Sequence, residues 1–205
     1  WARSQNRNIT DMTIGIIGVG HVGSIVERYC RALGMKVLLN DPPRAEKEGD
    51  AGFVSLKEIQ EEADIITVHT PLNKETFHLI DEDFLASCKN TPLIINAARG
   101  EVCETLSLLN YKGEIVLDCW EGEPNINLEL LDKVVLGTPH IAGYSVDGKA
   151  NGTWMSVQAI GKKFNLPCKD WKVTEVPNPA QPVEFCIDLN GKNIDQALDE
   201  AILYT

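Results

Sequence analysis

A glycine-rich turn at residues 18–23, Gly-Val-Gly-His-Val-Gly, constrains the fold of this chain more than any other feature. It follows the apolar run 13–17 and precedes a stretch with helical spacing. In such a unit the first glycine makes a tight turn, the second lets backbone approach a pyrophosphate, and the third lets helix and strand pack closely. The next apolar run ends at Asp41, where a carboxylate can accept hydrogen bonds from ribose hydroxyls. The pattern predicts a dinucleotide-binding unit, with a plain glycine-rich β–α turn as the alternative.

Composition excludes several classes of protein. The formal net charge of −11 over 205 residues argues against nucleic-acid binding, which needs an excess of Lys and Arg. No apolar stretch approaches the roughly 18 residues of a membrane helix, so we expect no membrane partner. The six cysteines are scattered, without a CxxC pair or a Cys/His cluster. This spacing is typical of reduced thiols in a cytoplasmic protein, and it predicts neither a disulfide frame nor a metal site.

Apolar runs that alternate with helical patterns indicate the fold class. Near-continuous Val/Ile/Leu runs separated by helices are typical of a parallel sheet that is covered on both faces. The sequence therefore predicts an α/β fold with a doubly wound (Rossmann) sheet and a ligand crevice at the carboxyl ends of its strands. Strands are expected at residues 13–17, 36–40, 64–69, 92–96, 115–118 and 134–137. Helices are expected after Gly23, at 55–62, where Ser55 and Glu58 have capping-box spacing, and at 81–87.

The last 60 residues follow a different pattern. Residues 146–164 have helical spacing, and residues 165–182 carry four prolines, which is typical of a linker. A short strand is expected at 183–189 and the start of a helix at 194–204. These segments cannot bury a core by themselves. The polar first residues and the interrupted final helix suggest a piece of a longer chain.

Four polar residues stand just past the ends of predicted strands: Thr70, Arg99, Asp118 and His140. Because the carboxyl ends of parallel strands meet at one edge, we expect these side chains to line one crevice. Oxidation of a 2-hydroxy acid needs a cation for the carboxylate, a base for the hydroxyl proton and an acid that orients the base. Arg99, His140 and Glu123 fit these roles, although Glu121 competes with Glu123 for the last one.

Several motifs show a resemblance to a known family. They are residues 40–45 (NDPPRA), 69–72 (HTPL), 118–124 (DCWEGEP), 140–144 (HIAGY), 147–150 (DGKA) and 152–153 (GT). Over residues 12–153 the chain resembles the D-isomer-specific 2-hydroxyacid dehydrogenases, and within them a subfamily that acts on a small phosphorylated 2-hydroxy acid. Many members carry Phe where this chain has Trp120.

The resemblance implies a set of site residues. Arg99, Glu123 and His140 would be catalytic, with His140 as the proton shuttle, and Tyr144 would touch the substrate. The cofactor would be NAD, with Asp118 on the nicotinamide carboxamide and Asp41 on the adenosine ribose. The expected cofactor-binding residues are Gly18, Gly20, His21, Val22, Gly23, Asp41, Thr70, Pro71, Ala97, Asp118 and Gly143.

The resemblance also implies a domain arrangement and a homodimer. Residues 1–145 would form the NAD-binding domain, 146–166 a helix leading back towards the substrate domain, and 167–205 a linker and the start of a C-terminal dimerisation domain. The first half of the substrate domain is missing from the pattern. The loop at 74–76 looks short, and so does the connection between 99 and 115, close to the minimum for a crossover of about 10–12 residues. We interpret both as deleted stretches.

Alternatives remain at this stage. The chain also fits another D-2-hydroxyacid dehydrogenase, of the phosphoglycerate or glycerate type, or a non-enzymatic NAD(H)-sensing protein on the same scaffold. His69 fits either a cofactor contact or a structural role, and Trp120 fits either a wall of the site or packing. His78 is interpreted as a loop residue. Arg44 follows two prolines, so we expect it to be poorly placed to replace Asp41.

Overall fold

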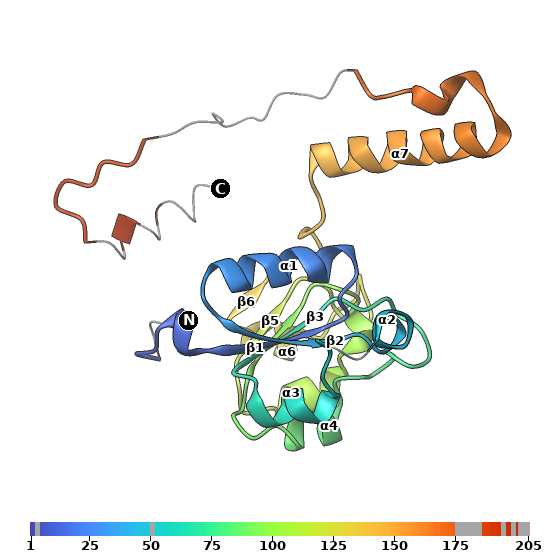
Figure 1. Ribbon diagram of the computed structural model, residues 1–205. Helices are drawn as coiled ribbons and strands as arrows, with labels where there is room; N and C mark the ends of the chain where they lie inside the picture. Colours follow the sequence, from blue (N-terminus) through green and yellow to red (C-terminus); the bar gives the residue numbers. More distant parts are fainter. Residues whose placement is uncertain (3–4, 50–51, 175–185, 194–195, 198–199, 201–205) are drawn as a thin grey trace. The chain divides into compact units, whose positions relative to one another are not determined.

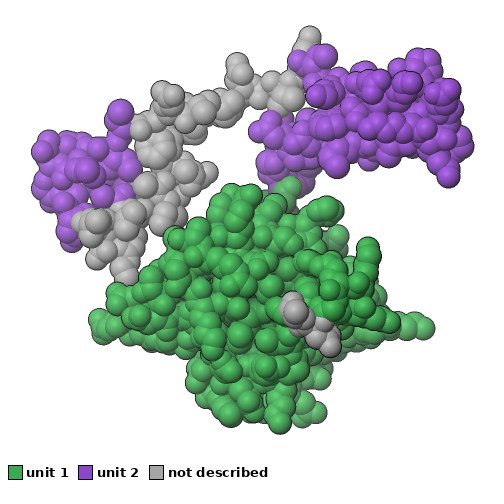
Figure 2. All heavy atoms as spheres, in the orientation of Figure 1, with its two compact units in different colours: residues 1–143 green, residues 144–205 purple. Residues whose placement is uncertain are grey.

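The structure is a computed structural model that describes residues 1–2, 5–49, 52–174, 186–193, 196–197 and 200. It divides into two compact units, residues 1–143 and residues 144–205 (Figure 2). No helix in the described ranges is long and apolar enough to cross a membrane.

The first unit is built on a six-stranded parallel sheet of order β2-β1-β3-β4-β5-β6 (Figure 1). The strands are β1 Thr13–Ile17, β2 Lys36–Asn40, β3 Ile65–Val68, β4 Leu93–Asn96, β5 Ile115–Leu117 and β6 Leu136–Gly137. The order reverses at β1, which pairs with β2 on one side and β3 on the other. Such a reversal opens a crevice beyond the strands' carboxyl ends. The predicted doubly wound α/β sheet is confirmed.

Helices lie on both sides of this sheet. In Figure 1, α1 lies on one side, and α3 and α4 lie on the other. The helices of the first unit are α1 His21–Ala32, α2 Pro42–Glu48, α3 Leu56–Glu62, α4 Glu82–Ala86, α5 Thr105–Asn110 and α6 Leu128–Lys133. Short 3₁₀ helices span η1 Ile9–Asp11 and η2 Gly100–Val102. The capping box is confirmed, because the Ser55 hydroxyl accepts the Glu58 N–H and the Glu58 carboxylate accepts the Ser55 N–H.

The connection between Arg99 and Ile115 is short but complete. The 3₁₀ helix η2, the helix α5 and a four-residue return to β5 form the crossover. An isolated bridge between Ile80 and Cys103 holds this connection beside the segment that precedes α4. A helix of six residues is enough here because the strands it joins are themselves only three and four residues long.

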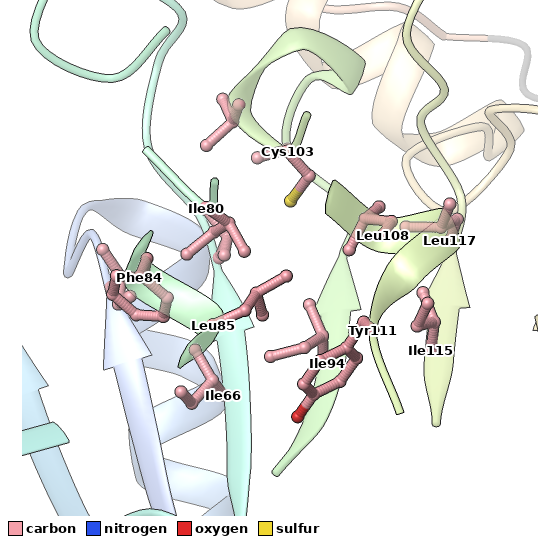
Figure 3. Packing of buried hydrophobic residues seen from close by; sticks show 14 of the residues in the cluster. Ile66, Ile80, Phe84, Leu85, Ile94, Cys103, Leu108, Tyr111, Ile115 and Leu117 are labelled. Atoms are coloured by element: carbon pink, nitrogen blue, oxygen red, sulfur yellow. The ribbon is translucent and has the colours of Figure 1, made fainter. Parts of the chain in front are cut away.

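Apolar side chains form one core on each face of the sheet. The larger core packs α3, α4 and α5 against the strands, and its centre is shown in Figure 3. Ile66 and Ile94 are fully buried there, and Tyr111 donates its hydroxyl to the Pro92 carbonyl at 2.5 Å. The smaller core lies under α1 and includes Met12, Ile16 and Cys30. Both faces of the sheet are therefore covered by apolar side chains, as a parallel sheet requires.

The second unit contains the predicted helix over residues 146–164. This is α7, Val146–Phe164, which begins at the Ser145 cap and ends at Asn165 in the left-handed conformation. A short 3₁₀ helix, η3 Pro167–Asp170, follows it. Of the strand expected at 183–189, residues 186–189 are described and form no strand. The rest of that segment, and most of the helix expected at 194–204, lie outside the described residues.

Candidate active site

The three glycines of the turn differ in their conformation and surroundings. Gly18 has φ +87°, and a Cβ on it would lie 2.7 Å from the His69 carbonyl carbon. A Cβ on Gly23 would lie 2.1 Å from the Gly18 carbonyl oxygen, so α1 packs against the turn only with glycine there. A Cβ on Gly20 would meet no described atom within 4 Å. The start of α1 is therefore open, and backbone N–H groups at such a helix N-terminus can donate hydrogen bonds to a pyrophosphate.

Asp41 ties the glycine turn to the end of β2. One carboxylate oxygen accepts the Val19 N–H at 2.8 Å, and the other accepts the Arg44 N–H at 3.0 Å as the cap of α2. Each oxygen retains a second lone pair, so a ribose hydroxyl can still donate to it.

Arg44 lies in the first turn of α2, which Asp41 caps. Its guanidinium donates to the Val19 carbonyl at 2.7 Å and to Glu48. The guanidinium is therefore engaged with the turn and with Glu48.

A cleft of about 510 Å³ lies at the point where the sheet order reverses. Its wall includes Gly18 and Asp41 at the ends of β1 and β2, and Thr70 and Pro71 after β3. The Thr70 hydroxyl is buried and has no hydrogen-bond partner among the described residues. The volume, the open space over Gly20 and the unpaired hydroxyl together fit the adenosine and pyrophosphate half of a dinucleotide.

Asn96 shapes the loop that carries Arg99. Its fully buried side chain donates to the Arg99 carbonyl at 2.8 Å and accepts the Ala98 N–H at 3.0 Å. A Cβ on Gly100 would lie 2.0 Å from the Trp120 carbonyl carbon, so this loop is locked against the loop after β5. Ala97 and Arg99 are left exposed, and the Arg99 guanidinium donates to the Ala98 carbonyl.

Asp118 holds the loop after β6. Its carboxylate accepts the Thr138 hydroxyl at 2.6 Å and the N–H groups of Ile141 and Ala142 at 2.7 and 3.0 Å. Burial by itself would raise the pKa of Asp118, but these hydrogen bonds outweigh it and lower the pKa. The adjoining Cys119 thiol is buried behind the Arg99 loop, and burial raises its pKa to about 12.

His140 and Glu123 form a hydrogen-bonded pair. Nδ1 of His140 lies 2.8 Å from one Glu123 oxygen, and the other oxygen accepts the Trp120 N–H at 2.6 Å. His140 has φ +56°, a strained conformation that the bond from its N–H to the Asp118 carbonyl helps to fix. With Nδ1 held by a carboxylate, Nε2 is left to exchange a proton with a substrate.

Glu121 pairs with His78 and not with His140. Its oxygens lie 2.6 Å from His78 Nε2 and accept the Thr105 N–H at 2.9 Å. Sequence reasoning treated His78 as a loop residue and missed this pair. The only signal was the second acid in DCWEGEP, which has no other partner nearby in the sequence.

Trp120 and Tyr144 have contrasting settings. Trp120 is buried, and its indole N–H donates to the Thr138 carbonyl at 2.9 Å, which ties the loops after β5 and β6 together. Tyr144 is the first residue of the second unit, where the Lys149 ammonium lies 3.3 Å from its ring centroid. Gly143, the last residue of the first unit, is exposed.

No group of three or more His, Cys, Asp or Glu side chains arranged for a metal ion occurs among the residues that the structure describes. The site is instead built for a nucleotide. The sheet order, the glycine turn and the cleft at the reversal define a dinucleotide-binding domain of the dehydrogenase type.

Comparison with known proteins specifies this class. The family model for the NAD-binding domain of the D-isomer specific 2-hydroxyacid dehydrogenases matches residues 1–142. The chain belongs to this family, and its cofactor is NAD.

Named relatives narrow the resemblance. The chain is 48% identical over 97% of its length to an erythronate-4-phosphate dehydrogenase from Bacteroides thetaiotaomicron, covering 58% of that protein. It is 43% identical over 100% of its length to one from Porphyromonas gingivalis, covering 57%. The chain thus spans little more than half the length of these relatives.

Solved structures agree on the fold. A D-lactate dehydrogenase from Aquifex aeolicus, complexed with NAD and lactic acid, matches 77% of this chain and 55% of its own at 33% identity, with a TM-score of 0.64. The holo form of D-mandelate dehydrogenase from Rhodotorula graminis matches 85% of this chain and 54% of its own at 29% identity, with a TM-score of 0.69.

Proposed function

We propose that the protein catalyses the NAD-dependent oxidation of 4-phospho-D-erythronate at C2, giving 2-oxo-3-hydroxy-4-phosphobutanoate, in the biosynthesis of pyridoxal 5′-phosphate. The observation that carries the proposal is the His140–Glu123 pair, on the same sheet edge as a cleft that fits NAD. Identity of 43–49% to relatives named erythronate-4-phosphate dehydrogenase supports the choice of substrate. The scattered free thiols fit a cytoplasmic enzyme.

The proposed chemistry divides among three side chains. Arg99 binds the substrate carboxylate and polarises the C2 oxygen, because a guanidinium can hold both groups at once. His140 takes the C2 hydroxyl proton on Nε2, and Glu123 orients the ring and stabilises its charged form. NAD, when bound, supplies the acceptor for the hydride. Tyr144 touches the substrate.

The proposed cofactor contacts follow the sheet edge. The N–H groups that open α1 hold the pyrophosphate, Asp41 takes the ribose hydroxyls, and Asp118 takes the carboxamide. The other proposed contacts are Gly18, Gly20, His21, Val22, Gly23, Thr70, Pro71, Ala97 and Gly143.

A substrate panel tests this function. Full-length protein should reduce NAD with 4-phosphoerythronate at a kcat/KM well above that with 3-phosphoglycerate or glycerate. Preference for one of the other two acids would make it a different D-2-hydroxyacid dehydrogenase. NAD(H) binding without turnover of any of the three would favour a sensor.

We propose that NAD is preferred over NADP because acidic groups surround the ribose side of the cleft. Asp41, Glu46 and Glu75 line it, and their charges repel a 2′-phosphate. Asp41→Ala should narrow the preference by about tenfold or more. Asp41→Asn, which keeps an acceptor for the α2 cap, separates lost charge from lost capping. Titration of each variant with both cofactors measures the effect, and equal affinity of the unmodified protein would contradict the placement.

Glu123→Gln should act mainly on the pH profile. The carboxylate beside Nδ1 stabilises the imidazolium form of His140, so its removal lets the ring release its proton at lower pH. Oxidation needs the neutral ring, so the His-dependent limb of kcat/KM should move to lower pH. A profile that matches the unmodified protein would remove Glu123 from the orienting role.

We further propose that the intact protein is a homodimer with three regions: an NAD-binding domain over 1–145, a helix leading towards the substrate domain over 146–166, and a linker with the start of a dimerisation domain over 167–205. Exposed apolar side chains on and after α7, among them Met155, Ile160 and Phe164, support it. Truncation after Phe164 should give monomers or insoluble material. Light scattering that shows a monomer of the intact protein at micromolar concentration would refute the dimer.

A further inference from the structure

The loop formed by residues 120–124 carries two glutamates that face opposite partners. Glu123 bonds to His140, whereas Glu121 bonds to His78 and to the backbone of Thr105. The proposed mechanism uses only the first of these acids. The second therefore needs an explanation of its own.

The contacts of Glu121 are those of an anchor. Its partner His78 follows Phe77, whose ring stacks on the imidazole at a centroid distance of 4.0 Å. The His78 N–H donates to the Glu101 carbonyl at 2.8 Å, which ties it to η2. The side chains of Glu121 and His78 are 26% and 27% exposed, so their bond is partly shielded from water.

The charges around this pair favour an ionised Glu121. Burial would raise its pKa, but the bonds from His78 and Thr105 outweigh that effect and lower the pKa. A second carboxylate, Glu104, lies 3.7 Å from the other nitrogen of His78. The imidazole thus stands between two acids, and Glu121 holds the shorter contact.

The loop needs such an anchor because a glycine separates Glu121 from Glu123. Gly122 is exposed and has φ +79°. Glu123 is fixed within the loop by its bond to the Trp120 N–H. Along the chain, Glu121 is the last side chain before Glu123 that bonds to a part of the domain outside the loop.

We propose that Glu121 is a positioning residue, which, through His78 and Thr105, fixes the 120–124 loop so that Glu123 meets Nδ1 of His140. This inference rests on the proposed function. If the anchor is released, Glu123 moves away from the imidazole and the imidazolium loses its stabilising charge. Of the two carboxylates with a described interaction with His140, Asp118 and Glu123, Asp118 then remains in place.

The test compares three variants of the full-length protein. Glu121→Ala removes both anchoring bonds. Glu121→Gln keeps an acceptor for the Thr105 N–H and a donor towards His78. Glu129→Ala removes one negative charge from the exposed first turn of α6 and serves as the matched control. The readouts are the midpoint of the His140 titration followed by NMR, kcat, and NAD affinity.

Glu121→Ala should move the His140 midpoint in the same direction as Glu123→Gln does. It should lower kcat by about 10- to 100-fold, the scale of a catalytic group displaced by an ångström, with NAD affinity nearly unchanged. Glu121→Gln should keep the His140 midpoint and kcat close to those of the unmodified protein, and Glu129→Ala should match the unmodified protein.

A folded Glu121→Ala variant with an unchanged His140 midpoint would overturn the proposal, whatever its kcat. A Gln variant as impaired as the Ala variant would overturn it as well. The NMR titration needs no substrate, so it tests the role of Glu121 even if the unmodified protein oxidises none of the three acids. Such a lack of turnover would overturn the proposed function and not the positioning role.

Discussion

Replacing His140 with alanine should lower kcat by about 10²–10⁴ and leave NAD affinity nearly unchanged. The imidazole is the proposed acceptor of the hydroxyl proton, and Glu123 already fills its Nδ1 side at 2.8 Å. Steady-state rates with 4-phosphoerythronate and cofactor titration give the two numbers.

Arg99→Ala should cause a loss of similar size for a different reason. It removes the cation that holds the substrate carboxylate, so KM should rise together with the fall in kcat. Arg31→Ala is the matched control, because Arg31 pairs with Glu27 on the surface of α1.

Retention of more than about a tenth of kcat in His140→Ala would assign the proton transfer to another group.

Gly23→Ala and Gly20→Ala should separate folding from cofactor binding. The new Cβ at position 23 would lie 2.1 Å from the Gly18 carbonyl oxygen, a backbone atom that cannot move without moving β1. We expect the free energy of unfolding to fall by about 3 kcal/mol, the upper range for overpacking. At position 20 the Cβ meets no atom of the described residues within 4 Å, and φ −75° suits alanine. Stability should therefore change by less than about 0.5 kcal/mol.

The same Cβ at position 20 occupies the space proposed for the pyrophosphate. NAD affinity of Gly20→Ala should consequently fall by about tenfold or more, since one misplaced contact of about 1.4 kcal/mol has that effect. Thermal unfolding and cofactor titration test both variants. A Gly20→Ala protein that binds NAD as tightly as the unmodified one would place the pyrophosphate elsewhere.

Elements with a clear apolar pattern were predictable from the sequence. The strands β1 and β2 and the helix α7 have the predicted bounds, because each has a long or continuous run of the right period. The helices α2, α5 and α6 were missed. They have six or seven residues each, too few for a helical period to stand out, and α2 begins with two prolines, which are typical of a turn.

The candidate site was predictable only where sequence order fixes proximity. The strand order predicted one crevice for Thr70, Arg99, Asp118 and His140. Of these four, Thr70 is the one among the described residues that line the cleft, where it lies with Gly18 and Asp41. The choice between Glu121 and Glu123 does not follow from the strand order. The two are two residues apart, and the turn at Gly122 decides which acid faces His140.

The buried thiol of Cys119 can report how often the loops around it open. It lies against the Ala98 carbonyl and the Asp118 carboxylate, behind the loops that carry Arg99 and His140. The thiolate is the form that attacks an alkylating reagent and displaces its leaving group, so this sulfur reacts only when those loops separate and water enters. The exposed Cys186 reacts without such an opening, so its labelling rate serves as an internal reference. The ratio of the two labelling rates, read by mass spectrometry, measures how often the catalytic loops come apart, with no substrate and no added dye.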